Sequence, residues 1–550
     1  MSCAERTRSP ARFPLEIRAA RTPDAPALLY RGDAQNPPWS PFAKGGDRGI
    51  SGLLPQVVSG SGTKQPCTMS FRKLDLLTAA LARELAARGV RPGDRVGLLL
   101  SSGPAYPVLL LSLLRAGAVA VPVSTRLPPA ALPDLLRRIG CRRLIGGADN
   151  VTGNDEGIEF VAAADLISMA SMECFEKIPF FPLCQRGSEG VSGEKVGNSA
   201  PAVPAASTLP TFDPKADATI VFTSGSTGTP KAALHTFENH WSSAAGSNRN
   251  IPLRPGDRWL LSLPPWHVGG LAVVFRCLLG GAAVAIPGKD EPLADAIRGL
   301  GATHLSLVAT QLYRLLREKR GREALLSLKV ILLGGGPVPT ALIEEAVRAG
   351  VRLVTSYGST EMSSQATACR PGDPPEVLNT AGRSLAFREL SVAADGEILV
   401  RGRTLFRGYV EETGVCAARD AAGWFHTGDL GRLDANGRLI VTGRRDTMFI
   451  SGGENIHPEE IEREILRFPG VLEAIVAPVP DPEFGARPVV FLRTVNGCLP
   501  DSTELDRFLR HTLPGFKIPQ RYLRWPDLEE GIKPDRRTFA ALALASPEAR

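Results

Sequence analysis

The sequence predicts an α/β protein with a large N-terminal domain of layered α/β subdomains and a small α+β C-terminal domain. Up to Val400, short apolar segments alternate with amphipathic segments of helical period, as in largely parallel sheets with crossover helices. After Val400, short strands and turns replace this alternation. The chain has 550 residues, more than a single hydrophobic core can hold, so two or three domains are expected.

The first predicted α/β unit begins at Phe71. Leucines recur there at helical spacing, and the strand-like segment Asp94–Leu100 follows a Pro-Gly turn. Tyr106–Ala116 predicts the next helix. The later segments predicted as short buried strands are Ala118–Val123, Ala218–Phe222, Ala282–Ile286, Leu305–Val308 and Val330–Leu333.

Two segments interrupt this alternation. Residues 32–68 are rich in Gly, Pro and Ser, and residues 146–215 are polar and without a clear period, so both are predicted as flexible insertions or long loops. The turn Gly443–Asp446 marks the predicted border between an N-terminal domain, residues 1–443, and a C-terminal domain, residues 444–550.

The composition disfavours several classes of protein. Hydrophobic residues make up 43% and charged residues 22%, as in a globular protein with a sizeable core. The net charge of +7 is spread along the chain without a basic block interleaved with aromatics, so no nucleic-acid partner is expected. No segment reaches the roughly 18 apolar residues of a membrane span. The nine cysteines are scattered and form no C-x-x-C pair, which predicts reduced thiols in a cytoplasmic protein. The oligomeric state is not predicted.

A loop rich in Ser, Thr and Gly follows the predicted strand Ala218–Phe222. Its residues are Thr223, Ser224, Gly225, Ser226, Thr227, Gly228, Thr229, Pro230 and Lys231. Glycines let consecutive backbone N–H groups point at one anion, the hydroxyls add donors, and Lys231 adds a positive charge. The loop is therefore predicted to bind phosphate; the alternative is a solvated linker. It is not a Walker A loop, which ends in Gly-Lys-Ser/Thr.

Two carboxylates stand in predicted turns further along the chain. Glu361 is suited to Mg²⁺, a hard cation that takes oxygen ligands and keeps waters and nucleotide phosphates in its shell, although a lone Glu is more often a surface residue. Asp429 follows an aromatic pair, and its two oxygens can accept hydrogen bonds from both hydroxyls of a ribose. The glycines 334–336 either let the backbone pack against a planar adenine or form a simple strand-to-helix turn.

Five further segments follow the phosphate loop in the order found in the adenylate-forming superfamily. They are Leu333–Pro337, Tyr357–Glu361, Trp424–Asp429, Gly443–Asp446 and Ser451–Ile456. The chain from about Phe71 to Ala541 resembles this superfamily, which includes acyl-CoA synthetases, firefly luciferase and the adenylation domains of peptide synthetases. The resemblance implies an adenylate-forming enzyme fold with a mobile C-terminal domain. It also implies an acid–thiol ligase that uses ATP, Mg²⁺ and coenzyme A and works through an acyl-adenylate.

The resemblance implies roles for individual residues. Glu361 and Thr227 would hold the metal ion, Asp446 would be the hinge of the C-terminal domain, and Gly452 and Gly453 would let the pantetheine arm of CoA pass close to the backbone. The residues expected to bind the nucleotide are Thr223, Ser224, Gly225, Ser226, Thr227, Gly228, Lys231, Gly334, Gly335, Gly336, Tyr357, Gly358, Thr360, Asp429 and Arg444.

The segment Glu530–Arg537 corresponds to the lysine segment of the superfamily, although Ile532 separates its usual Gly-Lys pair. Lys533 is assigned as the adenylation lysine, because an ammonium group can bridge the attacking carboxylate and the α-phosphate in the transition state. Lys517 is the alternative. If Lys533 did not reach the site, the chain would be a nucleotide-binding relative without catalysis.

Two segments, Ser262–Arg276 and Thr303–Leu316, resemble the o-succinylbenzoate–CoA ligases of menaquinone biosynthesis, which implies 2-succinylbenzoate as the acid. Its second carboxylate would need a polar or cationic partner, and His267, Thr310 and Arg276 are the candidates. His267 is also a candidate catalytic residue; the alternative is a packing role beside its neighbouring Trp. Two alternative functions remain: another aryl- or acyl-CoA ligase, and an adenylation module that loads a carrier protein.

Overall fold

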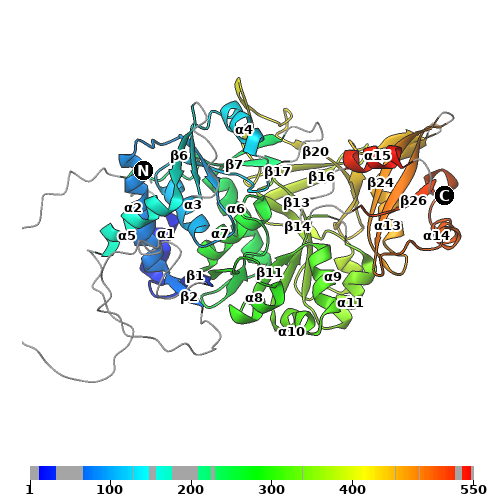
Figure 1. Ribbon diagram of the computed structural model, residues 1–550, viewed down its shortest axis with the longest axis horizontal. Helices are drawn as coiled ribbons and strands as arrows, with labels where there is room; N and C mark the ends of the chain where they lie inside the picture. Colours follow the sequence, from blue (N-terminus) through cyan, green and yellow to red (C-terminus); the bar gives the residue numbers. More distant parts are fainter. Residues whose placement is uncertain are drawn as a thin grey trace, which may run out of the picture.

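The predicted α/β fold is confirmed by the computed structural model of the chain, in which a large N-terminal part is followed by a smaller α+β part (Figure 1). In Figure 1 the smaller part, coloured orange to red, lies at the right-hand end. The structure describes residues 12–31, 66–127, 129–147, 157–175, 209–223, 230–336, 338–451, 454–481, 484–526 and 536–546.

The first sheet of the N-terminal part has nine strands among the described residues. Six neighbouring strands run parallel: β13, β12, β11, β9, β10 and β1. Antiparallel strands close the sheet at both edges. In sheet order the strands are β15 (Arg383–Ser384), β14 (Ser364–Ala368), β13 (Leu353–Ser359), β12 (Val330–Leu333), β11 (His304–Leu307), β9 (Arg258–Leu260), β10 (Ala283–Ile286), β1 (Pro26–Tyr30) and β2 (Cys67–Ser70). The three predicted strands in this region are confirmed.

The second sheet has eight strands in the same described part of the chain. Five of them, β7, β4, β3, β5 and β6, are parallel, and an antiparallel edge follows β7. In sheet order the strands are β19 (Gly414–Cys416), β18 (Gly408–Glu411), β8 (Lys231–Thr236), β7 (Asp217–Thr223), β4 (Val119–Pro122), β3 (Arg95–Leu99), β5 (Arg143–Gly146) and β6 (Glu159–Ala162). The predicted strands within Asp94–Leu100, Ala118–Val123 and Ala218–Phe222 are confirmed.

Helices α2 (Phe71–Ala87), α3 (Ala105–Arg115), α6 (Phe237–Asn250) and α7 (Val268–Gly280) lie between the two sheets (Figure 1). Their apolar side chains and those of the facing strands form one core. Helix α6 begins with a capping box between Thr236 and Asn239, and it contacts strands of both sheets.

Helices α1 and α5 pack on the helices between the sheets, and most of the other helices cover the outer faces of the sheets or belong to the C-terminal part. Helix α4 covers the second sheet, and α8 to α11 cover the first. Their bounds are α1 (Pro14–Arg21), α4 (Leu132–Arg138), α5 (Ala163–Phe175), α8 (Leu293–Gly299), α9 (Ala309–Arg317), α10 (Lys319–Ser327), α11 (Thr340–Arg348), α12 (Pro375–Leu378), α13 (Pro458–Ile465), α14 (Ser502–Leu509) and α15 (Arg536–Ala545). Among the described residues, no helix combines the length and apolar character needed to cross a bilayer.

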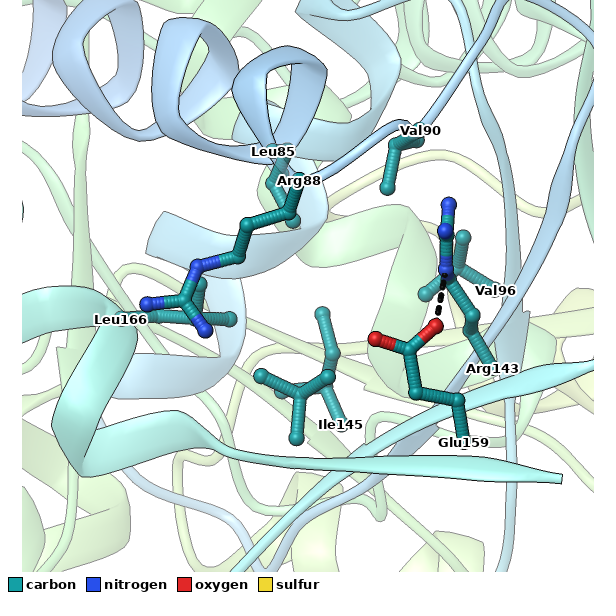
Figure 2. Close-up of a pocket in the computed structure, with 9 residues that line it drawn as sticks. Leu85, Arg88, Val90, Val96, Arg143, Ile145, Glu159 and Leu166 are labelled. Carbon is teal, nitrogen blue, oxygen red and sulfur yellow. Dashed lines mark hydrogen bonds and ion pairs between the residues drawn. The ribbon is translucent and has the colours of Figure 1, made fainter.

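The prediction that residues 146–215 form a long flexible loop was wrong for part of this segment. Residues 159–175 form strand β6, at the edge of the second sheet, and helix α5, which packs on α2. Arg143 and Glu159 form an ion pair across β5 and β6, with an N–O distance of 2.7 Å, beside a cavity of about 10 Å³ (Figure 2). Sequence periodicity missed this unit because an edge strand of four residues carries little alternation. Residues 32–65 of the other predicted insertion lie outside the described residues.

Three smaller sheets follow. The third sheet is antiparallel and consists of β16 (Arg388–Val392), β17 (Glu397–Gly402), β20 (Phe425–Leu433) and β21 (Leu439–Arg444). A short hairpin of β22 (Phe449–Ser451) and β23 (Glu454–Ile456) leads to the C-terminal sheet. That sheet contains β24 (Val471–Asp481), β25 (Gly485–Thr494) and β26 (Arg521–Arg524), with α13 and α14 on one face and α15 on the other.

A buried ion-pair cluster fixes α15 to the C-terminal sheet. Arg536 donates to Glu459 at 2.9 Å, to Glu462 and to the carbonyl of Val476. Glu462 also accepts the N–H of Val476 at 2.8 Å. Burial raises the pKa of Glu462, while the guanidinium of Arg536 favours its charged form. Without Arg536, the buried carboxylate of Glu462 would lose its cationic partner among the described residues.

We expect Arg536→Met to reduce the local stability of α13 and α15 by about 3–5 kcal/mol, because it leaves Glu462 buried without its cation. Hydrogen exchange followed by mass spectrometry would measure the loss of protection in peptides from the two helices. Arg537→Met, at an exposed position of the same helix, is the control. Equal protection in the two variants would contradict the expectation.

Candidate active site

Several described residues of the predicted nucleotide site lie at the ends of strands of the two large sheets. Thr223 is the last residue of β7 and faces Lys231, the first residue of β8, in the strand register. Gly334 directly follows β12, and Tyr357 lies near the end of β13. Ligands of open α/β sheets bind outside the carboxyl ends of the parallel strands, so this is the expected place for a nucleotide.

A short chain of contacts joins the phosphate loop to the predicted metal ligand. The Nζ of Lys231 lies 5.2 Å from the centre of the Tyr409 ring. The hydroxyl of Tyr409 donates to Oε1 of Glu361 at 2.6 Å. The ammonium, the hydroxyl and the carboxylate therefore form one polar cluster, which can take up the triphosphate and its cation together.

A second chain of contacts surrounds Asp429. The hydroxyl of Tyr357 donates to Oδ2 of Asp429 at 2.6 Å, and Arg444 lies 3.1 Å from Oδ1. Arg444 also donates to Asp446 at 2.8 Å. The predicted ribose ligand thus contacts its predicted partner Arg444, which in turn holds the predicted hinge residue.

The predicted turn at Asp429 was wrong, because this residue lies inside strand β20. Asp429 pairs with Arg444 of β21 in the strand register, and a β-bulge follows at Leu430 and Gly431. Gly428 has a φ of +71°, a backbone conformation that favours glycine. A Gly-Asp pair predicts a turn from local preferences, but here the third sheet extends through it.

Burial raises the pKa of Asp429. Its hydrogen bond from Tyr357 and the charge of Arg444 act in the opposite direction and favour the carboxylate. Burial and the neighbouring carboxylate also raise the pKa of Tyr357, so its phenol stays protonated and remains a donor. In the pair of Tyr357 and Asp429, the phenol is therefore the donor and the carboxylate the acceptor.

The turn that carries Glu361 is closely packed and strained. A Cβ on Gly358 would lie 2.0 Å from the carbonyl oxygen of Ser364, so only glycine fits there. Ser363 and Ser364 have φ values of +55° and +122°. Such conformations of non-glycine residues cost about 1–3 kcal/mol each and persist where the surrounding structure holds them. The backbone N–H of Phe406 donates to the carbonyl of Glu361 at 2.7 Å.

The predicted adenine-binding glycines follow β12. Gly335 has a φ of +91°, and a Cβ on Gly336 would meet no other atom within 4 Å. The backbone conformation at position 335 thus favours glycine, whereas a side chain at position 336 would have space. The stacking of adenine on these residues stays a prediction.

The three candidates for a second carboxylate differ in burial. His267 is the N-cap residue of α7 and is exposed, and Thr310 lies half-buried in α9. Arg276 of α7 is 1% exposed. Its guanidinium donates to Ser364 Oγ at 3.0 Å and to Gln365 Oε1 at 3.1 Å. The catalytic role predicted for His267 stays a prediction.

Arg276 is a buried cation without an acidic partner in the part of the chain that the structure describes, and its Nε has no hydrogen-bond partner there. Burial lowers the pKa of Arg276 to about 10. Burial and the charge of Arg276 lower the pKa of Arg388 to about 9. An anion bound beside Arg276 would satisfy its unpaired N–H and reduce the repulsion between the two guanidinium groups.

Several predicted site residues lie outside the described residues. They are Ser224, Gly225, Ser226, Thr227 and Gly228 of the phosphate loop, Gly452 and Gly453 of the predicted CoA loop, and Lys533. The alternative lysine, Lys517, donates to Glu460 at 2.6 Å. Lys517 is thus held in a contact within the C-terminal part.

Two contacts of the Glu361 turn involve residues that the sequence did not single out. Tyr409 is 48 residues from Glu361 in the chain, and no sequence signal connects them. His235 of β8 is fully buried and bonds the carbonyl oxygen of Thr360 at 2.8 Å through Nε2. Burial lowers the pKa of His235 to about 4, so the ring is neutral at pH 7. A histidine inside the apolar strand Lys231–Thr236 was a signal that could have pointed to it.

The residues around Glu361 fit Mg²⁺. In the described ranges no group of three or more His, Cys, Asp or Glu side chains gathers as a ligand set. Mg²⁺ in nucleotide enzymes is commonly held by one or two carboxylates, with substrate phosphates and waters completing its shell. The carboxylate of Glu361, whose Oε1 is oriented by Tyr409, meets this requirement.

Two family models match the chain. A model described as AMP-binding enzyme matches residues 15–410, and a model described as AMP-binding enzyme C-terminal domain matches residues 460–530. The chain belongs to the AMP-binding enzyme family. The resemblance to the adenylate-forming superfamily is thereby confirmed.

Individual relatives of this AMP-binding enzyme agree with the family models. The 2-succinylbenzoate–CoA ligase of Salmonella typhimurium is 34% identical over 476 residues, which cover 86% of this chain and 92% of the relative. The o-succinylbenzoate CoA synthetase of Bacillus subtilis, solved with the acyl-adenylate intermediate OSB-AMP, superimposes with a TM-score of 0.74 at 26% identity, over 98% of this chain and 99% of that one. The same enzyme solved with ATP and magnesium ion gives 0.73 at 27% identity, over 94% and 96%. The chain is an acid–thiol ligase of the AMP-forming acyl-CoA synthetase class.

His426 of this AMP-binding enzyme lies in β20 between two carboxylates. Its Nδ1 is 2.9 Å from Glu397, and its Nε2 is 3.4 Å from Asp420. The hydrogen bond with Glu397 is the main cause that raises the pKa of His426 above 6.5. A raised pKa in the folded state means that the charged ring adds stability below pH 6.5, and that this stability is lost as the pH rises through the raised pKa.

We expect His426→Gln to lower the Tm more at about pH 5.5 than at about pH 8.5, since only the lower pH charges the wild-type imidazole. The pair is half-exposed, so the difference should correspond to ~0.2–1 kcal/mol. Thermal unfolding of both proteins at the two pH values measures it. His511→Gln, at an exposed ring that bonds a backbone carbonyl, is the control. An equal loss at both pH values would refute the contribution of the charged ring.

Proposed function

We propose that this enzyme is a 2-succinylbenzoate–CoA ligase, which converts 2-succinylbenzoate, ATP and CoA into 2-succinylbenzoyl-CoA, AMP and diphosphate. This reaction is a step of menaquinone biosynthesis. The observation that carries the proposal is the buried guanidinium of Arg276, which has no acidic partner among the described residues and donates to Ser364, three residues after Glu361. A site for a dicarboxylic acid needs such a cation beside the adenylation centre. The similarity to ligases named for this acid supports the same substrate.

The chemistry needs two steps, because a free carboxylate has oxide as its leaving group and resists attack by a thiol. In the first step a carboxylate oxygen attacks the α-phosphorus of ATP, the bond to the bridging oxygen breaks, and diphosphate leaves. In the second step the CoA sulfur attacks the acyl carbon of the adenylate, loses its proton, and releases AMP. Positioning and electrostatics supply most of the catalysis in such displacements.

The described residues have distinct tasks in this scheme. Asp429 accepts the ribose hydroxyls, with its orientation set by Tyr357 and Arg444. Lys231 draws the departing diphosphate away from the α-phosphate. Bound Mg²⁺ would supply positive charge to the phosphates, and Glu361 would be its protein ligand.

Residues outside the described ranges complete the proposal. Lys533 orients the attacking carboxylate, the loop 224–228 donates N–H groups to the phosphates, and Gly452 and Gly453 give the pantetheine arm a path. Residues 444–550 are proposed to move as a domain about Asp446 between the two steps. The contact between Arg444 and Asp446 at the start of this segment supports a hinge there. The reaction is proposed to take place in the cytoplasm, where ATP and CoA are available; the cysteines among the described residues are all free thiols.

The substrate test uses the purified enzyme with Mg-ATP, CoA and a panel of acids, and follows AMP release. We expect turnover with 2-succinylbenzoate and at least about 30-fold lower kcat/KM with benzoate, which lacks the second carboxylate. Turnover of benzoate without turnover of 2-succinylbenzoate would reject the proposed acid. Activity with a holo-carrier protein and none with free CoA would reject the proposed acceptor.

Arg276→Met should remove most of the preference for the dicarboxylic acid. Loss of one partner of a buried charge pair costs about 2–5 kcal/mol, so kcat/KM for 2-succinylbenzoate should fall by about 30-fold or more. Both acids are compared at saturating Mg-ATP, because Arg276 also donates to Ser364 of the turn that carries Glu361, and its loss is expected to raise the KM for ATP with either acid. Steady-state kinetics with both acids checks this, with Arg249→Met, an exposed arginine of α6, as control. An unchanged ratio between the two acids would exclude Arg276 as the carboxylate ligand.

A further inference from the structure

Two buried histidines lie next to the active site and have no task in the proposed reaction. His235 of β8 and His240 of α6 are at most 1% exposed, and their ring centres are 5.0 Å apart. His240 stacks on Phe275 at 4.7 Å, and its Nε2 bonds Thr219 Oγ1 at 2.7 Å. Both of these partners of His240, Phe275 and Thr219, are buried. Only His235 reaches the turn that carries Glu361.

The contact of His235 with that turn has a defined direction. Its Nε2 lies 2.8 Å from the carbonyl oxygen of Thr360. A carbonyl oxygen accepts hydrogen bonds, so Nε2 carries the proton and donates it. The bond therefore fixes the peptide group between Thr360 and Glu361, from which the Glu361 side chain departs.

The turn needs such anchors because its backbone is strained at Ser363 and Ser364. Ser243 donates to the carbonyl of Ser363 at 2.9 Å, and Arg276 donates to the Ser364 hydroxyl at 3.0 Å. These two bonds hold the far end of the turn. Nearer Glu361, the side chain of His235 bonds the backbone carbonyl of Thr360. The hydroxyl of Tyr409 bonds the Glu361 carboxylate itself.

We propose that His235 is a positioning residue that keeps the Glu361 carboxylate directed toward the Mg²⁺ of bound ATP by donating Nε2–H to the Thr360 carbonyl. The inference rests on the proposed function only in taking Glu361 as the protein ligand of this ion. It links β8, which begins with Lys231 of the phosphate loop, to the metal-binding turn. One strand thus positions both the cation for the phosphates and the carboxylate for the metal.

The test compares the binding of ATP with and without Mg²⁺, using isothermal titration calorimetry on the full chain in MgCl₂ or in EDTA. We expect His235→Leu to weaken the binding of Mg-ATP by about tenfold, the loss that one buried hydrogen bond can cause, and to change ATP binding in EDTA less than about twofold. His235→Gln places an amide N–H near the former Nε2 and should restore the wild-type ratio within about threefold.

His240→Leu is the matched control, because it removes a neighbouring buried histidine that does not touch the turn. It should lower the Tm as much as His235→Leu and leave the ratio between Mg-ATP and ATP affinities unchanged. Equal losses with and without Mg²⁺ in His235→Leu, or the same shift in His240→Leu, would overturn the proposal. A wild-type chain whose affinity for ATP is independent of Mg²⁺ would overturn the metal role of Glu361 and this inference with it. The titrations are carried out without the carboxylic acid. An error in the proposed acid substrate would therefore be detected only in the turnover assay with the panel of acids.

Discussion

The hydrogen bond of 2.6 Å from Tyr357 to Asp429 joins the parts of this enzyme on which its function depends. Tyr357 lies near the end of β13 in the first sheet, and Asp429 lies in β20 of the third sheet. The other oxygen of Asp429 faces Arg444, which leads to Asp446 and the C-terminal part. Burial opposes the charge of Asp429, and its two partners favour the charged carboxylate. The proposed ribose acceptor and the proposed hinge are thus held by one set of contacts.

The turn that carries Glu361, the proposed metal ligand, is strained, and its surroundings hold it. Glycine at 358 lets two strands approach, and Ser363 and Ser364 take backbone conformations that their side chains disfavour. The hydrogen bonds that offset this cost come from separate elements, including β8, α6 and α7. A carboxylate positioned in this way needs little reorganisation when the nucleotide binds, which is the condition for electrostatic catalysis.

The buried arginines lower the stability of the free protein, and the proposed substrate would offset this cost. Arg276 and Arg388 carry charge in the core, and each lacks an acidic partner among the residues that the structure describes. An isolated buried cation is costly in the free protein. The cost becomes useful when a substrate brings a carboxylate of its own, because an acid without that group leaves the cation unpaired.

Much of the fold followed from the sequence, since the strands in Ala218–Phe222 and Val330–Leu333 are apolar runs between helical segments. The strand β6 and helix α5 did not, because a short edge strand depends on its neighbour for its structure more than on its own pattern. For the site, ordered motifs led to Glu361, Asp429 and Arg444. No pattern led to Tyr409, whose contact with Glu361 joins residues 48 apart in the chain.

The sequence by itself determined the α/β class, the family and the chemical types gathered at the nucleotide site, because these depend on local composition and on motif order. The tertiary structure decided which side chains meet: Tyr357 with Asp429, Tyr409 with Glu361, and His235 with Thr360. It also distinguished the buried Arg276 from the exposed His267. Burial and hydrogen-bond direction arise only when distant segments pack together, and a linear pattern does not contain them.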